Sequence, residues 1–131
     1  MTSAIRNVTL LASAARTATT TSADQTNKGE NLNVRGVLVT LDVTAITATP
    51  SITLSIQAKD PASGKYEALL TASAAVTATG THSYLVYPGA GSASGDVTQV
   101  AGFVLPNTWR ISVAHGDTDS ITYSAGGMLL P

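Results

Sequence analysis

The sequence has little charge and no cysteine, and these two shortages exclude several kinds of protein. Only 11% of the 131 residues are charged and the net charge is −1, whereas about 25% charged residues is usual. Because no basic stripe is present to neutralise phosphates, nucleic acid is not expected as a ligand. The absence of cysteine excludes disulfides and thiolate chemistry.

Long apolar runs are also missing. No stretch of about 18 apolar residues occurs, so we expect no membrane span. Residues 1–6 lack the charged start and the apolar run of a signal peptide, and the sequon at Asn7-Val8-Thr9 is therefore not expected to carry a glycan. Low charge combined with 44% apolar residues favours a protein docked against neighbours, because free monomers usually carry more charge to stay soluble.

Small residues are what the sequence has in excess: alanine, threonine and serine account for 53 of the 131 residues. They stand among alternating valine, isoleucine and leucine, a pattern typical of strands. In the clearest strand, residues 36–43, one face carries Val37, Val39, Leu41 and Val43, and the other carries Leu38, Thr40 and Asp42. About eight such short strands, with turns every 8–12 residues, predict a single domain over residues 1–131. The fold class is an all-β antiparallel sandwich of jelly-roll or Ig-like topology.

Turn residues and aromatic residues refine this prediction. Residues 60–65 have proline early and glycine late, which predicts a tight hairpin turn between strands at 52–59 and 66–71. Residues 72–78 are alanine-rich but contain β-branched residues, which favours a strand or an extended link over a helix. Trp109 alternates with Ile111 and Val113, so we expect it in the core rather than on a sugar-stacking platform with the four tyrosines.

Three segments lack the strand pattern and are candidates for contacts with other subunits. Residues 15–33 predict a surface loop or an extended arm that orders against a neighbour, residues 88–102 predict a flexible glycine loop, and residues 128–131 predict an apolar docking end. The glycine loop lacks the Lys-Ser/Thr ending of a phosphate-binding loop. The contact candidates are Thr17, Thr20, Gln25, Asn27, Asn31, Pro88, Gly91, Gly95, Met128, Leu129 and Leu130.

Few residues could carry chemistry. Asp117 and Asp119 resemble the start of a calcium loop, but the glycine and glutamate that complete an EF-hand are missing, so a capped turn is the stronger interpretation. His115 and Asp117 could join a serine in a hydrolase triad, yet no Gly-x-Ser-x-Gly elbow is present. Glu67 is one of only two glutamates, and nothing places a second carboxylate beside it. The sequence therefore predicts no catalytic residue, no metal and no cofactor.

Several strand and turn signatures together resemble a family of small proteins encoded by tailed bacteriophages and regarded as virion structural proteins. The signatures lie at residues 41–45 with 49–51, at residues 56–66, and at residues 105–110 followed by 119–124, and the resemblance covers most of the chain from about Ala15 onward. The motifs are structural rather than catalytic. Ala58 stands where members of this family usually have glycine, a departure that concerns packing.

The resemblance implies a non-enzymatic virion component. The expected role is a capsid decoration or cement protein that binds and stabilises the capsid surface, with the major capsid protein or other virion subunits as partners. A homo-oligomer is expected, a trimer being plausible, located in the virion after assembly in the bacterial cytoplasm. The alternatives are a tail, neck or baseplate subunit, or a glycan-binding module displayed on the virion.

Overall fold

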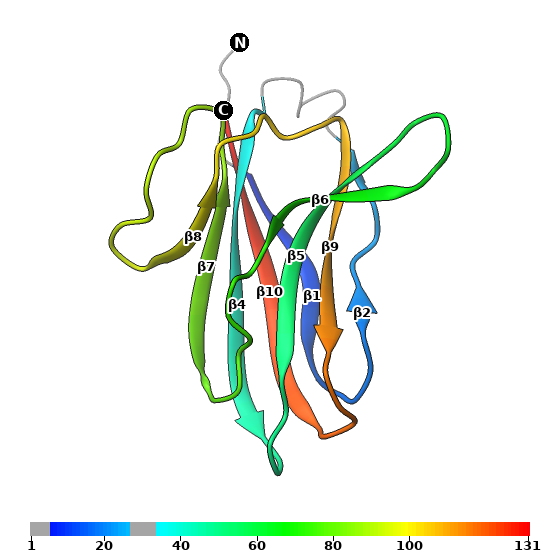
Figure 1. Cartoon of the computed structure of the whole chain (residues 1–131), viewed down its shortest axis with the longest axis vertical. Coiled ribbons are helices and arrows are strands. Elements are labelled where there is room, and N and C mark those ends of the chain that lie inside the picture. Colours follow the sequence, from blue (N-terminus) through cyan, green and yellow to red (C-terminus); the bar gives the residue numbers. More distant parts are fainter. Residues whose placement is uncertain (1–5, 27–33) are drawn as a thin grey trace.

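The computed structural model describes residues 6–26 and 34–131, which form two β-sheets packed face to face (Figure 1). These residues contain no helix, and so no helix able to cross a membrane. The predicted all-β, predominantly antiparallel sandwich is confirmed. The described residues form ten strands instead of about eight, and two of the ten are only two residues long.

Sheet A has five strands in the order β1–β10–β4–β7–β8. Their bounds are β1 Arg6–Arg16, β4 Gly36–Ile46, β7 Gly80–Val86, β8 Val97–Ala101 and β10 Ile121–Leu130. All neighbouring strands are antiparallel except β7 and β8, which run parallel. The long strands β10 and β4 lie at the centre, so most of the sheet is made by residues far apart in the sequence.

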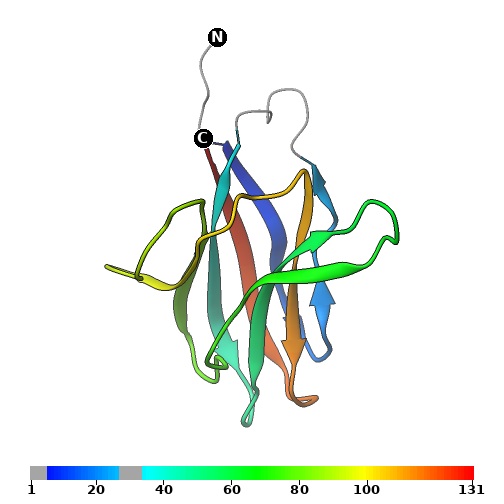
Figure 2. The ribbon, with the colours of Figure 1, turned by 45° about the horizontal axis from the view of Figure 1, so that its top comes forward.

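Sheet B packs against sheet A and is built around β9 and β5 (Figure 2). Its strands are β2 Thr20–Thr21, β3 Gln25–Thr26, β5 Ile52–Lys59, β6 Tyr66–Thr71 and β9 Thr108–His115. β2 and β3 both pair with β9, and β6 pairs with β5 on the other side. All these pairs are antiparallel.

The inner faces of the two sheets form one core, as the alternation predicts. Val37, Val39 and Leu41 are fully buried, while Leu38 and Thr40 between them are half-buried on the outer face. Trp109 is 0% exposed, which confirms its expected place in the core. Each fully buried large apolar side chain contributes about 1.5–3 kcal/mol by removal from water.

The predicted hairpin turn joins β5 to β6. Gly64 has a φ of 73°, a conformation that glycine adopts without steric cost, and its N–H bonds to the Asp60 carbonyl oxygen at 2.9 Å. The Asp60 carboxylate accepts hydrogen bonds from the Ser63 hydroxyl and from the Ser63 backbone N–H, and these bonds lower the pKa of Asp60. The alanine-rich residues 72–78 form a link without a helix, tied to β5 by a bridge between Val76 and Ile52 and by a 2.9 Å hydrogen bond from the Ala72 N–H to the Leu54 carbonyl oxygen.

The described part of segment 15–33 differs from the expected loop or arm. Residues 15 and 16 belong to β1, and residues 19–26 lie along the edge of β9 in the same chain. Buried Ser22 exchanges two hydrogen bonds with Ile111, each 3.0 Å long. The segment thus covers an edge of its own sheet, and residues 27–33, with the candidates Asn27 and Asn31, lie outside the described residues.

The predicted glycine loop is shorter than expected, because residues 97–101 form β8. The strand was missed because it pairs in parallel with β7, a long-range pairing that leaves little local signal. Gln99 ties β8 to sheet B: its side-chain amide donates to the Thr71 carbonyl at 2.7 Å and accepts from the Ser73 N–H at 2.7 Å.

The C-terminal residues are part of a central strand rather than a free apolar end. Met128 pairs with Asn7 of β1 and Leu38 of β4, and Leu129 is buried in the core. The carbonyl oxygen of Pro131 accepts a 2.6 Å hydrogen bond from the Tyr87 hydroxyl. Of the three predicted C-terminal contact residues, only Met128 is exposed, at 39%.

Candidate functional site

The acidic pair after β9 forms a capped turn. The Asp117 carboxylate accepts a hydrogen bond from the Asp119 N–H at 3.1 Å. The Asp119 carboxylate in turn accepts from the Thr49 N–H at 3.2 Å. No group of three or more metal-ligating side chains gathers anywhere in residues 6–26 and 34–131. The pair is therefore engaged in joining the turn to the loop that carries Thr49.

His115 bonds to a tyrosine and not to a serine. Its Nε2 lies 2.9 Å from the Tyr123 hydroxyl, and the Arg16 guanidinium stacks 4.6 Å from the centroid of the Tyr123 ring. Burial lowers the pKa of His115 below its usual 6.5, Asp117 opposes this shift, and Arg16 adds to it. The imidazole is therefore neutral at neutral pH. The three side chains form an internal packing contact.

The predicted contact residues do not form one site. Thr17 is exposed and follows β1, whereas Thr20 and Gln25 are half-buried against β9. Gly91 and Gly95 are exposed in the connection between β7 and β8, and Pro88 is half-buried there. These residues and Met128 lie on separate elements, so the structure does not gather the candidates into a common surface.

The aromatic side chains are mostly internal. Trp109, Tyr84 and Tyr123 are at most 1% exposed, and burial raises the pKa values of both these tyrosines. Within residues 6–26 and 34–131, the Trp109 Nε1–H has no hydrogen-bond partner. Tyr66 and Tyr87 are half-buried, and each has an arginine guanidinium over its ring.

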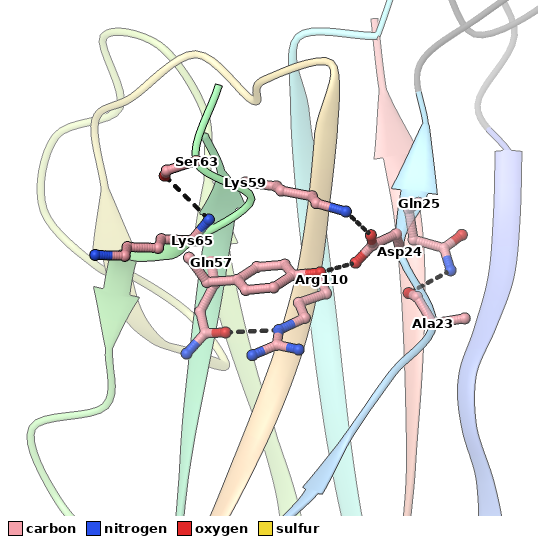
Figure 3. Close-up of polar contacts among 9 residues, drawn as sticks. Ala23, Asp24, Gln25, Gln57, Lys59, Ser63, Lys65 and Arg110 are labelled. Atoms are coloured by element: carbon pink, nitrogen blue, oxygen red, sulfur yellow. Dashed lines mark hydrogen bonds and ion pairs between the residues drawn. The ribbon is translucent and has the colours of Figure 1, made fainter. Parts of the chain in front are cut away.

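The outer face of sheet B carries a cluster of interlocked polar side chains (Figure 3). The Arg110 guanidinium lies 3.4 Å from the Tyr66 ring centroid and its Nε donates to Gln57 at 2.8 Å. The Asp24 carboxylate accepts from the Tyr66 hydroxyl at 2.7 Å and from Lys59 at 3.1 Å. These two bonds lower the pKa of Asp24, and Asp24 raises the pKa of Lys59. The charged groups on this face thus bind one another.

One end of the sandwich carries two neighbouring exposed apolar side chains. Phe103 is 55% exposed and Val104 is 59% exposed, in the connection that crosses from β8 to β9 (Figures 1 and 2). The next residue, Leu105, is buried, and its N–H bonds to the Arg35 carbonyl oxygen at 2.8 Å. The exposed pair is therefore held by an anchored backbone.

The outer face of sheet A carries an apolar surface that spans four strands. In register, Met128 of β10 lies beside Leu38 of β4, Leu38 beside Leu85 of β7, and Leu85 beside Val100 of β8. A Cβ at Gly36 would lie 2.4 Å from the Tyr87 ring, so this ring covers the strand there. We call this surface the sheet A patch: Leu38, Leu85, Tyr87, Val100, Met128 and Leu130.

Both apolar surfaces were missed as sites by sequence reasoning, although each left a signal. The pair Phe103-Val104, which contains the chain's single phenylalanine, lies outside any alternating strand. Leu38 and Leu85 fall on the faces of their strands opposite the core residues. Each is unremarkable alone, and only the pairing of β4 with β7 places them side by side.

The chain was also compared with protein-family models, curated proteins and solved structures, and none of them matches it.

Proposed function

We propose that this protein is a non-enzymatic structural subunit of a bacteriophage virion, and that it binds the capsid surface as a decoration or cement protein. The observation that carries the proposal is the exposed pair Phe103 and Val104 at one end of a closed β-sandwich. Exposed apolar side chains at fixed positions favour burial against another protein. The similarity of the turn and strand signatures to tailed-phage virion proteins supplies the class of partner, the major capsid protein.

The connection between β8 and β9 that carries Phe103 and Val104, here called the end loop, is held in place by contacts within the chain. Ala101 packs against the core and its carbonyl oxygen accepts from the Tyr87 N–H at 3.1 Å, while Leu105 is anchored on the other side of the pair. A Cβ on Gly102 would lie 3.2 Å from the Ala90 carbonyl oxygen, so glycine permits the close backbone approach. Pre-ordering of this kind lowers the entropy cost of association.

The polar side chains that resemble catalytic groups are engaged in internal contacts, which supports adhesion over chemistry. His115 bonds to Tyr123, Asp117 accepts from the Asp119 N–H, and Asp119 accepts from the Thr49 N–H. These bonds stabilise the fold and the turns.

A tail, neck or baseplate subunit would use the same end loop against a different virion partner. A glycan-binding module would instead need Trp109 or two tyrosines to face the solvent, and Trp109 is buried while Tyr66 is stacked beneath Arg110. The observations therefore favour a subunit of the particle over a glycan-binding module.

Particles of the phage that encodes the chain provide the test. A phage lacking the gene is complemented with the wild-type chain or with Phe103→Ser combined with Val104→Ser, and the chain is quantified in purified particles by mass spectrometry. We expect wild-type chain in the particles and about a tenfold loss for the double variant, because two apolar contacts are removed. Separation of heads from tails decides between a capsid role and a tail role.

Ile46→Ser is the matched control, because Ile46 is an exposed apolar residue, 37% accessible, at the far end of β4. It should leave incorporation unchanged, and all variants should keep the wild-type melting temperature. Absence of the expressed chain from purified particles would refute the virion role. Undiminished incorporation of the double variant would refute the end loop as the docking element.

A further inference from the structure

The sheet A patch is apolar, and several of its neighbouring polar groups have hydrogen-bond partners within the chain. The Thr40 and Ser83 hydroxyls lie 3.3 Å apart. The Thr81 hydroxyl donates to Asp42 at 3.0 Å, and the Tyr87 hydroxyl donates to the Pro131 carbonyl oxygen. Covering this face would therefore leave these groups hydrogen-bonded, so it would avoid the main cost of burying polar atoms.

The same face is hollowed where two glycines interrupt β10. The hollow has a volume of about 300 Å³ and is lined by Asn7, Val8, Leu38, Thr40, Gly126, Gly127 and Met128. Gly126 lies level with Thr40 across the strand pair, and Met128 lies level with Leu38. An exposed Met128 side chain thus stands directly beside a hollow that is lined largely by apolar groups.

Two side chains of opposite charge lie on either side of the patch along the direction of β4. Asp42 is a half-buried outer-face residue of β4. Arg35, exposed and just before the strand, places its guanidinium 5.8 Å from the Tyr87 ring of the patch. The two residues are seven positions apart, or about 24 Å along an extended strand. The patch lies between them.

We propose that the occupant of the sheet A patch is a second copy of this chain, related by a two-fold axis lying between the two sheets and perpendicular to β4. This operation reverses the strand direction and places Arg35 of each copy over Asp42 of the other. A two-fold axis parallel to β4 would instead put Arg35 on Arg35 and Asp42 on Asp42. The charge pattern therefore selects one orientation of an interface that pairs the same surface of both copies.

The same two-fold axis is also consistent with the shape of the surface. Its position, midway between Arg35 and Asp42, falls beside Leu38, so the two Leu38 side chains meet at the centre. Met128 of each copy then projects at a level between Met128 and Gly126 of the other, which is where the hollow opens. An exposed methionine in an apolar hollow is a favourable contact, because the flexible thioether adapts to irregular space.

The overlap of the two faces is that of a weak, reversible dimer. With the axis midway between Arg35 and Asp42, residues 36–41 of β4 overlap with those of the other copy over about 20 Å, and five strands are about 19 Å wide. The resulting area, about 400 Å² per copy, is below the roughly 800 Å² per partner of a standard protein–protein interface and is in the range of transient contacts. This inference does not depend on the virion role, because self-association is measured on the isolated full-length chain.

Sedimentation velocity of the full chain, from about 1 μM to about 1 mM, tests the proposal. We expect a concentration-dependent monomer–dimer equilibrium in the wild type. Arg35→Glu should raise the dimer dissociation constant about tenfold or more. The substitution replaces both Arg35–Asp42 attractions of the dimer, one in each direction, by repulsion between like charges. Asp42→Arg should weaken the dimer similarly, and the double variant, with both charges exchanged, should recover wild-type affinity to within about threefold.

Lys65→Glu is the matched control, since it reverses an exposed charge in the β5–β6 turn of sheet B and should not affect association. A chain that stays monomeric throughout the concentration range would overturn the proposal. So would unchanged association of Arg35→Glu, a single exposed substitution that leaves the core intact. Failure of the folded double variant to recover, or dimer loss in Lys65→Glu, would assign the interface to another geometry or another face.

Discussion

The two outer faces of the sandwich differ in their polar side chains. On sheet B, Asp24, Lys59, Tyr66, Arg110 and Gln57 form one connected cluster. On sheet A, the patch is apolar, the hydroxyl groups beside it bond within the chain, and β4 carries the outward-facing charge of Asp42. Both faces cover the same core, so the difference does not arise from the fold itself.

The contrast teaches how a chain with few charges divides its surface. Polar side chains that bond to one another, as on sheet B, gain little from a protein partner, because binding would have to replace contacts already made. On sheet A, the apolar side chains lie beside hydroxyl groups that already have hydrogen-bond partners within the chain. Burying such a surface against a partner is favourable, because it removes apolar area from water. Substitutions on sheet B should therefore change stability, and substitutions on sheet A should change association.

The largest expected effect comes from the core that supports both faces. Trp109→Ala removes a completely buried side chain and should lower the free energy of unfolding by about 3–5 kcal/mol. Urea denaturation followed by circular dichroism measures this change. Trp109→Phe should cost clearly less, since it keeps an aromatic ring and the lost Nε1–H had no hydrogen-bond partner. Equal losses for both variants would contradict the packing role of the ring.

The next effect distinguishes the sheet B face from the sheet A face. Arg110→Ala removes a stack on Tyr66 and a hydrogen bond to Gln57, and should lower the free energy of unfolding by about 1–2 kcal/mol. Arg110→Lys should recover only part of this loss, because an ammonium lacks the planar fork of a guanidinium. Sedimentation should show unaltered association in both variants. A change in association without a change in the free energy of unfolding would contradict the expectation that substitutions on sheet B affect stability and not association.

The smallest effect is the acid sensitivity of the sheet B cluster. The Tyr66 hydroxyl and Lys59 hold the pKa of Asp24 below its ordinary 3.8, so the unfolded chain takes up the proton first as the pH falls. The stability that Asp24 provides is therefore present above about pH 4 and is lost as the pH falls through the lowered pKa. Asp24→Asn should be less stable than wild type at neutral pH, and this difference should shrink in acid and in high salt.

Urea titrations at a series of pH values, at low and at high ionic strength, measure this difference. The Asp24 carboxylate is exposed to solvent, so the effect should be modest at every pH. A difference between wild type and Asp24→Asn that grows on acidification would have the wrong sign for a lowered pKa.

Much of the fold could be predicted because its information is local. Alternation at residues 36–43 places Val37, Val39 and Leu41 in the core, and the alternation around Trp109 does the same for β9. The hairpin at residues 60–65 follows from a proline and a glycine with φ near 73°. A period of two and a turn with fixed backbone angles are properties of neighbouring residues, so the sequence shows them directly.

The failures concern long-range pairing. Residues 19–26 lie on β9 because the edge of that strand has unpaired backbone groups, a need that the local sequence of the segment does not reveal. Residues 97–101 contain the β-branched residues Val97, Thr98 and Val100, but they follow a glycine- and serine-rich run, and their partner β7 pairs with them in parallel rather than through a hairpin turn. The C-terminal residues read as an apolar end, whereas β1 and β4 place them between two strands.

The sequence by itself determined the class of the fold, the identity of the core and the shortage of groups for chemistry. Composition and alternation do not depend on which strands pair, so both can be seen in the sequence alone. Only the tertiary structure decided where the surface is apolar and where it is charged. Leu38, Leu85, Val100 and Met128 belong to four separate strands, and sheet pairing makes them neighbours. A sheet brings distant residues side by side at hydrogen-bonding distance, and a surface formed in this way has no signature in any one segment.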